Sequence, residues 1–171
     1  DPGADVYLAT VGDTPGGDVH RVTRHTSSYP PTAVVHTEEG FVLAWGDDRY
    51  RHIEIFVARV TEEGMIAQAP RRLTVTTVSE DAPGGVLAVD SSQGPTLATL
   101  DDQLVAVWGG PGQAGRQQAY MTTLSTTGKP RGAPMALTEG KTDAFGMQLT
   151  SNLRGAMLTY CVQGTRGSEM F

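Results

Sequence analysis

The stretch that decides the fold is FVLAWGDDR at residues 41–49, followed by IEIFVARV at 53–60 and the polar turn TEEG at 61–64. An apolar run that ends in an aromatic residue, here Trp45, is typical of a buried β-strand, and turn residues separate it from the next run. A second copy of this succession reads LVAVW at 104–108, QAY at 118–120 and STTG at 125–128. The chain therefore contains an internal repeat, and the repeat governs how every other motif is interpreted.

Four landmarks recur in the same order along the chain. They are an aromatic residue closing an apolar run, an acid or amide two positions before an aromatic residue, a polar turn ending in glycine, and an aliphatic-threonine pair. The first landmark is Trp45, Trp108 and Tyr160, and the third ends at Gly16, Gly64 and Gly128. The second occupies 5–7, 54–56, 118–120 and 169–171, and the fourth occupies 22–23, 73–74 and 137–138.

The spacing of the landmarks supports a true repeat. Phe56 lies 17 residues before Leu73, and Tyr120 lies 17 residues before Leu137. The intervals 23–45 and 138–160 are both 22 residues, whereas 74–108 is 34 residues, so the middle unit carries 12 extra residues, expected within 79–94. A period of about fifty residues follows.

Each period holds four short apolar runs, which in the first complete unit are 32–36, 41–45, 53–60 and 71–74. Four antiparallel strands repeated at this interval are typical of the blades of a β-propeller, and an irregular β-sandwich is the alternative. We therefore predict an all-β chain of three repeat periods that is entered and left mid-blade. The predicted single region, 1–171, divides into an outer half-blade (5–24), a blade (25–74), a blade with the insertion at 79–94 (75–138) and an inner half-blade (139–171).

The segment from Trp45 to Arg49, followed by the strand at 55–60, resembles the blades of secreted bacterial β-propellers whose repeat reads W-x-D-x-R. The resemblance implies a propeller fold and an extracytoplasmic location: secreted, periplasmic or at the cell surface. Only the first unit carries the aspartate and arginine, because Trp108 is followed by GGPG and Tyr160 by CVQG. A role that the family gives these two residues is therefore not carried over to the other units.

The composition of the chain excludes several classes of partner and several kinds of site. The 171 residues include 13 Lys and Arg against 19 Asp and Glu, a net charge of −6, and the basic residues form no stripe, so nucleic acid and anionic membranes are poor partners. The lone Cys161 excludes an intrachain disulfide and a cysteine-cluster metal site. The four histidines show no metal-ligand spacing, and no phosphate-binding glycine loop or nucleophile elbow occurs, so no catalytic and no metal residue is predicted.

Five residues are candidates for ligand binding: Trp45, Asp47, Asp48, Arg49 and Trp108. The two aspartates could bind sugar hydroxyls, or calcium as the one cofactor that they would suit, and Arg49 an anion. The structural alternative, which we favour, is that Asp47 accepts backbone hydrogen bonds in the turn while Arg49 bridges to a neighbouring blade. The two tryptophans could stack on a sugar ring, but their place at the end of an apolar strand favours core packing.

The function expected from these observations is a non-enzymatic binding or scaffold propeller that recognises a protein or glycan through its loops. The alternative is a polysaccharide- or glycan-cleaving propeller enzyme with carboxylates at its central channel, for which 47–48 and 101–102 supply acids. The repeat arithmetic also predicts that the first strands pair with inner strands from elsewhere, either in a homodimer that completes a six-bladed ring or in the remainder of a longer propeller. Gly64 and Gly128 are predicted to have positive φ, because each ends an equivalent turn.

Overall fold

The structure is a computed structural model that describes residues 4–11, 17–24, 28–50, 52–75, 93–112, 116–139, 141–152, 154–164 and 167–170. Every regular element in these ranges is a β-strand. The strands are β1 (Tyr7–Ala9), β2 (Val19–Arg21), β3 (Ser28–Thr37), β4 (Gly40–Asp47), β5 (Glu54–Val60), β6 (Ile66–Arg72), β7 (Gln93–Leu100), β8 (Gln103–Pro111), β9 (Gln117–Ser125), β10 (Met135–Ala136), β11 (Asp143–Asn152), β12 (Gly155–Gly164) and β13 (Gly167–Met170).

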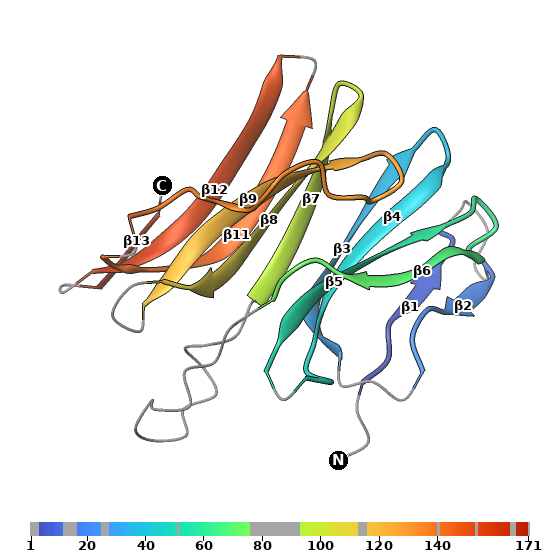
Figure 1. Ribbon diagram of the computed structural model, residues 1–171, viewed down its shortest axis with the longest axis horizontal. Helices are drawn as coiled ribbons and strands as arrows, with labels where there is room; N and C mark the ends of the chain where they lie inside the picture. Colours follow the sequence, from blue (N-terminus) through green and yellow to red (C-terminus); the bar gives the residue numbers. More distant parts are fainter. Residues whose placement is uncertain are drawn as a thin grey trace.

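These strands form four antiparallel sheets, which we number along the chain: β1-β2, β3-β4-β5-β6, β7-β8-β9-β10 and β11-β12-β13 (Figure 1). The all-β class and the four-stranded antiparallel units are thereby confirmed. The first and fourth sheets are separate sheets in the described part of the chain, so the number of blades and the closure of a ring remain predictions.

Two boundaries differ from the expectation. The fourth strand of the second sheet begins at Ile66 rather than Arg71, because the turn closes at once with the Thr61 amide donating to the Met65 carbonyl at 2.8 Å. The predicted insertion at 79–94 lies outside the described residues except for Gln93 and Gly94, which begin β7.

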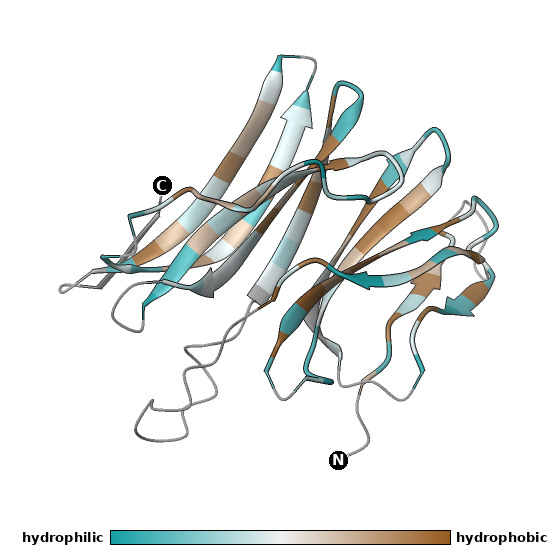
Figure 2. Ribbon diagram, viewed as in Figure 1, coloured by the Kyte–Doolittle hydropathy of each residue, from teal (hydrophilic) through white to brown (hydrophobic). Residues whose placement is uncertain are grey.

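The sheets pack face to face because their strands alternate between two cores. Along β4, Val42 and Ala44 join a cluster with the third sheet, whereas Leu43 and Trp45 join a cluster with the first sheet. Strand β8 repeats this division between the second and fourth sheets. Alternate residues of a strand point to opposite faces, so a run that is apolar throughout serves two neighbouring sheets at once (Figure 2).

Two of the four sequence landmarks form one polar contact, between the acid or amide at the start of the third strand and the threonine after the fourth. We call this contact the latch. In the second sheet, the Thr74 hydroxyl accepts a hydrogen bond from the Ile55 amide at 2.9 Å and donates one to the Glu54 carboxylate. The corresponding partners in the first and third sheets are Asp5 with Thr23 and Gln118 with Thr138. The acid or amide that opens the third strand is thus tied to the threonine that follows the fourth, and the end of each sheet is held together.

A bulge in the innermost strand accounts for the first landmark. The register of β3, β7 and β11 shifts between 29 and 33, 93 and 96, and 145 and 148. In each case the residue skipped on the neighbouring strand is the landmark aromatic: Trp45, Trp108 or Tyr160. Gly94 and Gly146 adopt φ of 59° and 64° inside these bulges, a conformation that glycine reaches without strain.

The turns between the third and fourth strands confirm the prediction for the two glycines. Gly64 and Gly128 both have φ of 78°. In each turn the glycine amide donates to the carbonyl three residues earlier, that of Thr61 or Ser125.

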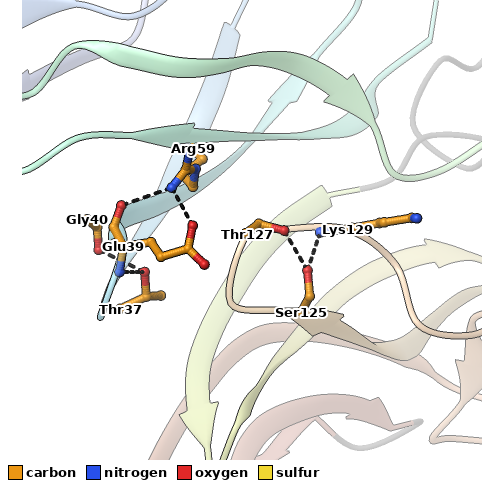
Figure 3. A network of polar contacts seen from close by, with 7 residues as sticks. All are labelled: Thr37, Glu39, Gly40, Arg59, Ser125, Thr127 and Lys129. Carbon is orange, nitrogen blue, oxygen red and sulfur yellow. Dashed lines mark hydrogen bonds and ion pairs between the residues drawn. The ribbon is translucent and has the colours of Figure 1, made fainter.

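Short side-chain bonds stabilise one end of the blades, which we call the hairpin end (Figure 3). In the β3-β4 hairpin, Arg59 Nη1 donates to the Glu39 carboxylate at 2.7 Å and to the Glu39 carbonyl at 3.2 Å. In the β9-β10 turn, the amide of Lys129 donates to the Ser125 hydroxyl at 3.1 Å. The opposite end is named the Asp47 end, after the residue at which β4 finishes.

Candidate functional site

At the Asp47 end of the second sheet, four polar residues form a buried row across the strands. Ser28, Asp47 and Glu54 are direct register partners on β3, β4 and β5, and Thr74 follows β6. Asp47 and Glu54 have no exposed surface, and Ser28 and Thr74 are buried. Buried carboxylates are costly unless other groups bind them, so the residues that bind this pair define the chemistry of this end.

Arg49 binds Asp47 through both its side chain and its backbone. Its amide and Nε donate to Asp47 Oδ1 at 3.0 and 2.9 Å, and its Nη2 donates to Oδ2 at 2.7 Å. Burial alone would raise the pKa of Asp47, but these bonds outweigh burial and hold the pKa below its ordinary value. The same contact raises the pKa of Arg49, so the pair stays charged.

Glu54 is bound by a different set of groups. The Thr74 hydroxyl donates to one of its oxygens, and His52 Nε2 lies 2.9 Å from Oε1. The His52 side chain keeps 16% of its surface exposed, whereas Glu54 keeps none. The carboxylate therefore fixes the orientation of an imidazole that still reaches solvent.

Aromatic rings and guanidinium groups cover this buried row. The Arg49 guanidinium lies 4.4 Å from the centroid of the Phe56 ring, and that of Arg72 lies 4.5 Å from the centroid of the Tyr50 ring. Tyr50 and Phe56 stack with centroids 6.2 Å apart and planes 2° apart. Tyr50 is 48% exposed whereas Phe56 is 3% exposed, so the Asp47 end presents to solvent the ring of Tyr50 and the Arg49 side chain, which is 36% exposed.

A carboxylate also opens the innermost strand of the fourth sheet. Asp143 begins β11, and its oxygens accept bonds from the Gln117 amide and from Arg116 Nη1, both at 2.9 Å. These contacts lower the pKa of Asp143, and 28% of its side chain stays exposed. Because Arg116 and Gln117 lie where β8 passes into β9, Asp143 belongs to the Asp47 end.

The five predicted ligand-binding residues occupy different surroundings. Trp45 is fully buried and Trp108 is 3% exposed, and they stack on Phe56 and Tyr120 with centroids 6.1 and 6.3 Å apart. Asp48 is half-buried, and the Arg49 side chain is 36% exposed. Of the five residues, Asp48 and Arg49 are the two whose side chains reach solvent. The ligand-binding role of the five stays a prediction.

The expected structural roles of the Asp47 turn are met in part. Asp47 accepts a backbone hydrogen bond, as expected. The hydrogen bonds that Arg49 makes in the structure go back to Asp47 within its own turn, whereas a bridge to a neighbouring blade was expected. The other acids considered, Asp101 and Asp102, lie in the β7-β8 hairpin at the opposite end of the blades, as expected.

A cavity of about 640 Å³ adjoins this end, between the outer strands of the first and second sheets. Its lining is Val19, His20, Arg21, Val22, Thr23, Arg24, Arg49, Gly64, Met65, Ile66 and Pro70. The sequence offered no signal for this cavity, because its walls come from β2, β6 and two turns. The latch, by contrast, joins residues of two landmarks that recur at similar spacings in the sequence.

The described ranges contain neither a metal-binding cluster nor a membrane-spanning helix. No group of three or more His, Cys, Asp or Glu side chains there is arranged to hold a metal ion. In the same part of the chain, no helix has the length and apolar character needed to cross a membrane.

Sequence comparison finds no matching family model and no matching curated protein. Structure comparison finds similarity to an endo-arabinase from Bacteroides thetaiotaomicron, with a TM-score of 0.61 and 14% sequence identity. The match covers 99% of this chain and 64% of the endo-arabinase, so this chain spans less than two thirds of that protein.

This similarity supports the propeller-like fold and corrects the functional expectation. The prediction of a non-enzymatic binding or scaffold propeller is corrected, because a structure that shares the fold over 99% of this chain is that of an enzyme. The sequence argument failed because it sought a local catalytic motif. In a propeller the side chains of one site come from several blades that are distant in sequence.

Proposed function

We propose that this chain forms blades of a glycan-cleaving propeller enzyme whose substrate lies across the Asp47 end. The observation that carries the proposal is the shared fold with an endo-arabinase over 99% of the chain. The surface of that end adds support, because the exposed Tyr50 ring can stack on a sugar ring and the Arg49 guanidinium can donate hydrogen bonds to sugar hydroxyls.

The residues divide into two groups under this proposal. Asp47 and Glu54 are positioning residues, because both are fully buried and bind Arg49 and His52. Arg49, Tyr50 and His52 contact the substrate. Asp143 is the carboxylate assigned to the reaction, since it lies on an innermost strand, is partly exposed and stays ionised at neutral pH. An ionised carboxylate serves as nucleophile, base or stabiliser of an oxocarbenium-like transition state.

The test is cleavage of polysaccharides by the protein and three variants. Linear arabinan is the first substrate, followed by galactan, xylan and β-glucan, with new reducing ends measured and products sized by chromatography. We expect internal cleavage by the wild type, loss of at least about 100-fold in rate for Asp143→Asn, and a smaller loss for Arg49→Ala.

Arg131→Ala is the matched control. Arg131 also pairs with an aspartate, Asp102, at 3.5 Å, but that pair lies at the hairpin end. Its rate should stay within about two-fold of the wild type. A folded protein that releases no reducing ends from any substrate would contradict the proposal, as would full activity in Asp143→Asn.

An extracytoplasmic location belongs to the same proposal, because polysaccharides of this kind are met outside the cytoplasm. Fractionation of the producing cells, followed by immunodetection of the protein, tests it. Recovery of the protein solely in the cytoplasmic fraction would contradict this location.

A further inference from the structure

The described part of the chain has a cavity between the outer strands of the first and second sheets and a smaller space between the second and third. That smaller space, where the β9-β10 turn lies over β5 and β6, holds about 10 Å³, against about 640 Å³ for the first. The larger cavity takes its chemical character from the side chains around it.

Those side chains make the larger cavity cationic. Among the described residues, its lining includes His20, Arg21, Arg24 and Arg49 and no aspartate or glutamate. Asp5 binds Arg21, and Asp47 binds Arg49. Each of these carboxylates uses part of one guanidinium and holds it in place, while the remaining N–H groups stay available as donors.

Arg24 supplies the charge that is not balanced locally. It is exposed on the wall of the cavity and forms no ion pair with any residue in the described ranges. His20, on the same wall, likewise has no ion-pair partner there. An anion entering the cavity would therefore meet an exposed guanidinium beside two that are fixed in orientation.

Apart from Thr23 and Gly64, the other lining residues are apolar. Val19, Val22, Met65, Ile66 and Pro70 provide aliphatic surface. Gly64 keeps the cavity open on the hairpin side, because a Cβ at this position would lie 2.5 Å from Cδ2 of His20. Aliphatic surface next to fixed polar groups is the usual composition of a small-molecule site, and this volume falls in the usual range.

We infer that this cavity binds a carboxylate-bearing saccharide, such as an oligomer of uronic acid. Guanidinium groups bind carboxylates through paired N–H donors, and the aliphatic lining suits the C–H face of a sugar ring. A single inorganic anion would leave most of the volume and all of the apolar surface unused. The inference goes beyond the proposed function and does not depend on it, since it concerns binding and requires no cleavage.

The test measures binding of trigalacturonate by isothermal titration calorimetry, with a neutral trisaccharide of similar size and inorganic phosphate as comparison ligands. We expect trigalacturonate to bind, the two comparison ligands to bind at least about ten-fold more weakly, and the affinity to fall with added salt. Arg24→Gln should weaken trigalacturonate binding by about ten-fold or more.

Arg154→Gln is the matched control, since Arg154 is exposed in the β11-β12 turn and its amide is bonded to Asn152. It should bind as the wild type does. Equal loss in both variants would show general charge attraction and overturn the inference, as would equal binding of the neutral sugar or of phosphate. If the wild-type protein binds trigalacturonate but cleaves no polysaccharide, the result contradicts the proposed function and leaves this inference standing.

Discussion

Asp47 has no exposed surface, yet it stays ionised because three donors of Arg49 bind it. Its pKa in the folded state lies below that of an unfolded chain. A depressed carboxyl pKa stabilises the fold at pH values above the unfolded pKa, and this stabilisation is lost as the pH falls through the folded pKa. The contribution of Asp47 is therefore complete at neutral pH and declines below about pH 4.

We predict that Asp47→Asn lowers the free energy of unfolding by about 1–3 kcal/mol at pH 7, because charge-assisted bonds are replaced by weaker ones. The difference from the wild type should shrink below about pH 4. Urea unfolding at pH 7, 5 and 3 measures both effects. Asp102→Asn is the control, since that side chain is 82% exposed. A deficit that is absent at pH 7, or constant across the three pH values, would contradict the assignment.

A second prediction concerns the paired turn glycines. Gly64→Ala and Gly128→Ala should each cost about 1 kcal/mol or more, because both positions have φ of 78°. The two should differ in local effect, since the new Cβ would lie 2.5 Å from His20 Cδ2 at position 64 but 3.4 Å from Val42 Cγ1 at position 128. Unfolding experiments test the cost, and NMR of the His20 ring tests the displacement. An unchanged His20 signal in Gly64→Ala would contradict the contact.

At the scale of the strand and sheet, the latch ties the end of each fourth strand to the start of the third. The fourth strands are short or poorly covered: β10 contains two residues, and both are exposed. Just past the last paired residues of the third and fourth strands, one more backbone hydrogen bond recurs in three sheets. The Val22 amide donates to the Val6 carbonyl, the Leu73 amide to the Ile55 carbonyl, and the Leu137 amide to the Ala119 carbonyl. The threonine that follows adds the side-chain bonds.

We predict that Thr74→Val destabilises the protein more than Thr138→Val does. Thr74 loses a bond to the Ile55 amide and one to the buried Glu54 carboxylate, a cost of about 2–4 kcal/mol in total. Thr138 loses only the bond to the Ala119 amide, about 1 kcal/mol, because Gln118 bonds to its carbonyl, which valine retains. Urea unfolding of both variants measures the difference, and equal or reversed costs would contradict the latch.

These elements also show how far the sequence could be used. The landmarks predicted the four-stranded units and the conformation of Gly64 and Gly128, because local turn chemistry and strand periodicity are written in adjacent residues. They did not predict the bulges opposite Trp45 and its equivalents, since register depends on packing between strands. The sequence singled out 47–49 as candidate binding residues, and that role stays a prediction. The Glu54–His52 contact and the contacts of Asp143 depend on the pairing of strands and the approach of two sheets, which no local motif encodes.

At the scale of the whole molecule, some apolar side chains are exposed although the side chains at the equivalent positions of other repeats are buried. Met157 on the fourth sheet is 68% exposed, whereas the equivalent Val42 and Val105 are 0% and 4% exposed. Tyr7 on the first sheet is 57% exposed, whereas the equivalent Phe56 is 3% exposed. Met157 and Tyr7 therefore each lie on an exposed face whose counterpart elsewhere in the chain is covered by another sheet.

We predict that a second copy of the chain covers these faces and gives a two-fold assembly with twice the monomer mass of 18.1 kDa. Light scattering coupled to size-exclusion chromatography measures the mass. Met157→Lys should shift the equilibrium to the monomer. Met135→Lys should not, because Met135 is similarly exposed, at 56%, but lies on the outermost strand of the third sheet. A wild-type monomer at all concentrations would contradict the prediction.

The latch also affects how the number of repeats in such a chain can change during evolution. Its partners are 18 to 20 residues apart, within one period, so a duplicated gene segment of one period brings both halves with it. The copied unit would not depend on recruiting a distant residue to secure its outer edge. Sequence drift could then proceed independently in each copy, as the replacement of Glu54 by Gln118 at the same position illustrates. Recombination between repeats would change the length of the protein while leaving every unit able to close itself.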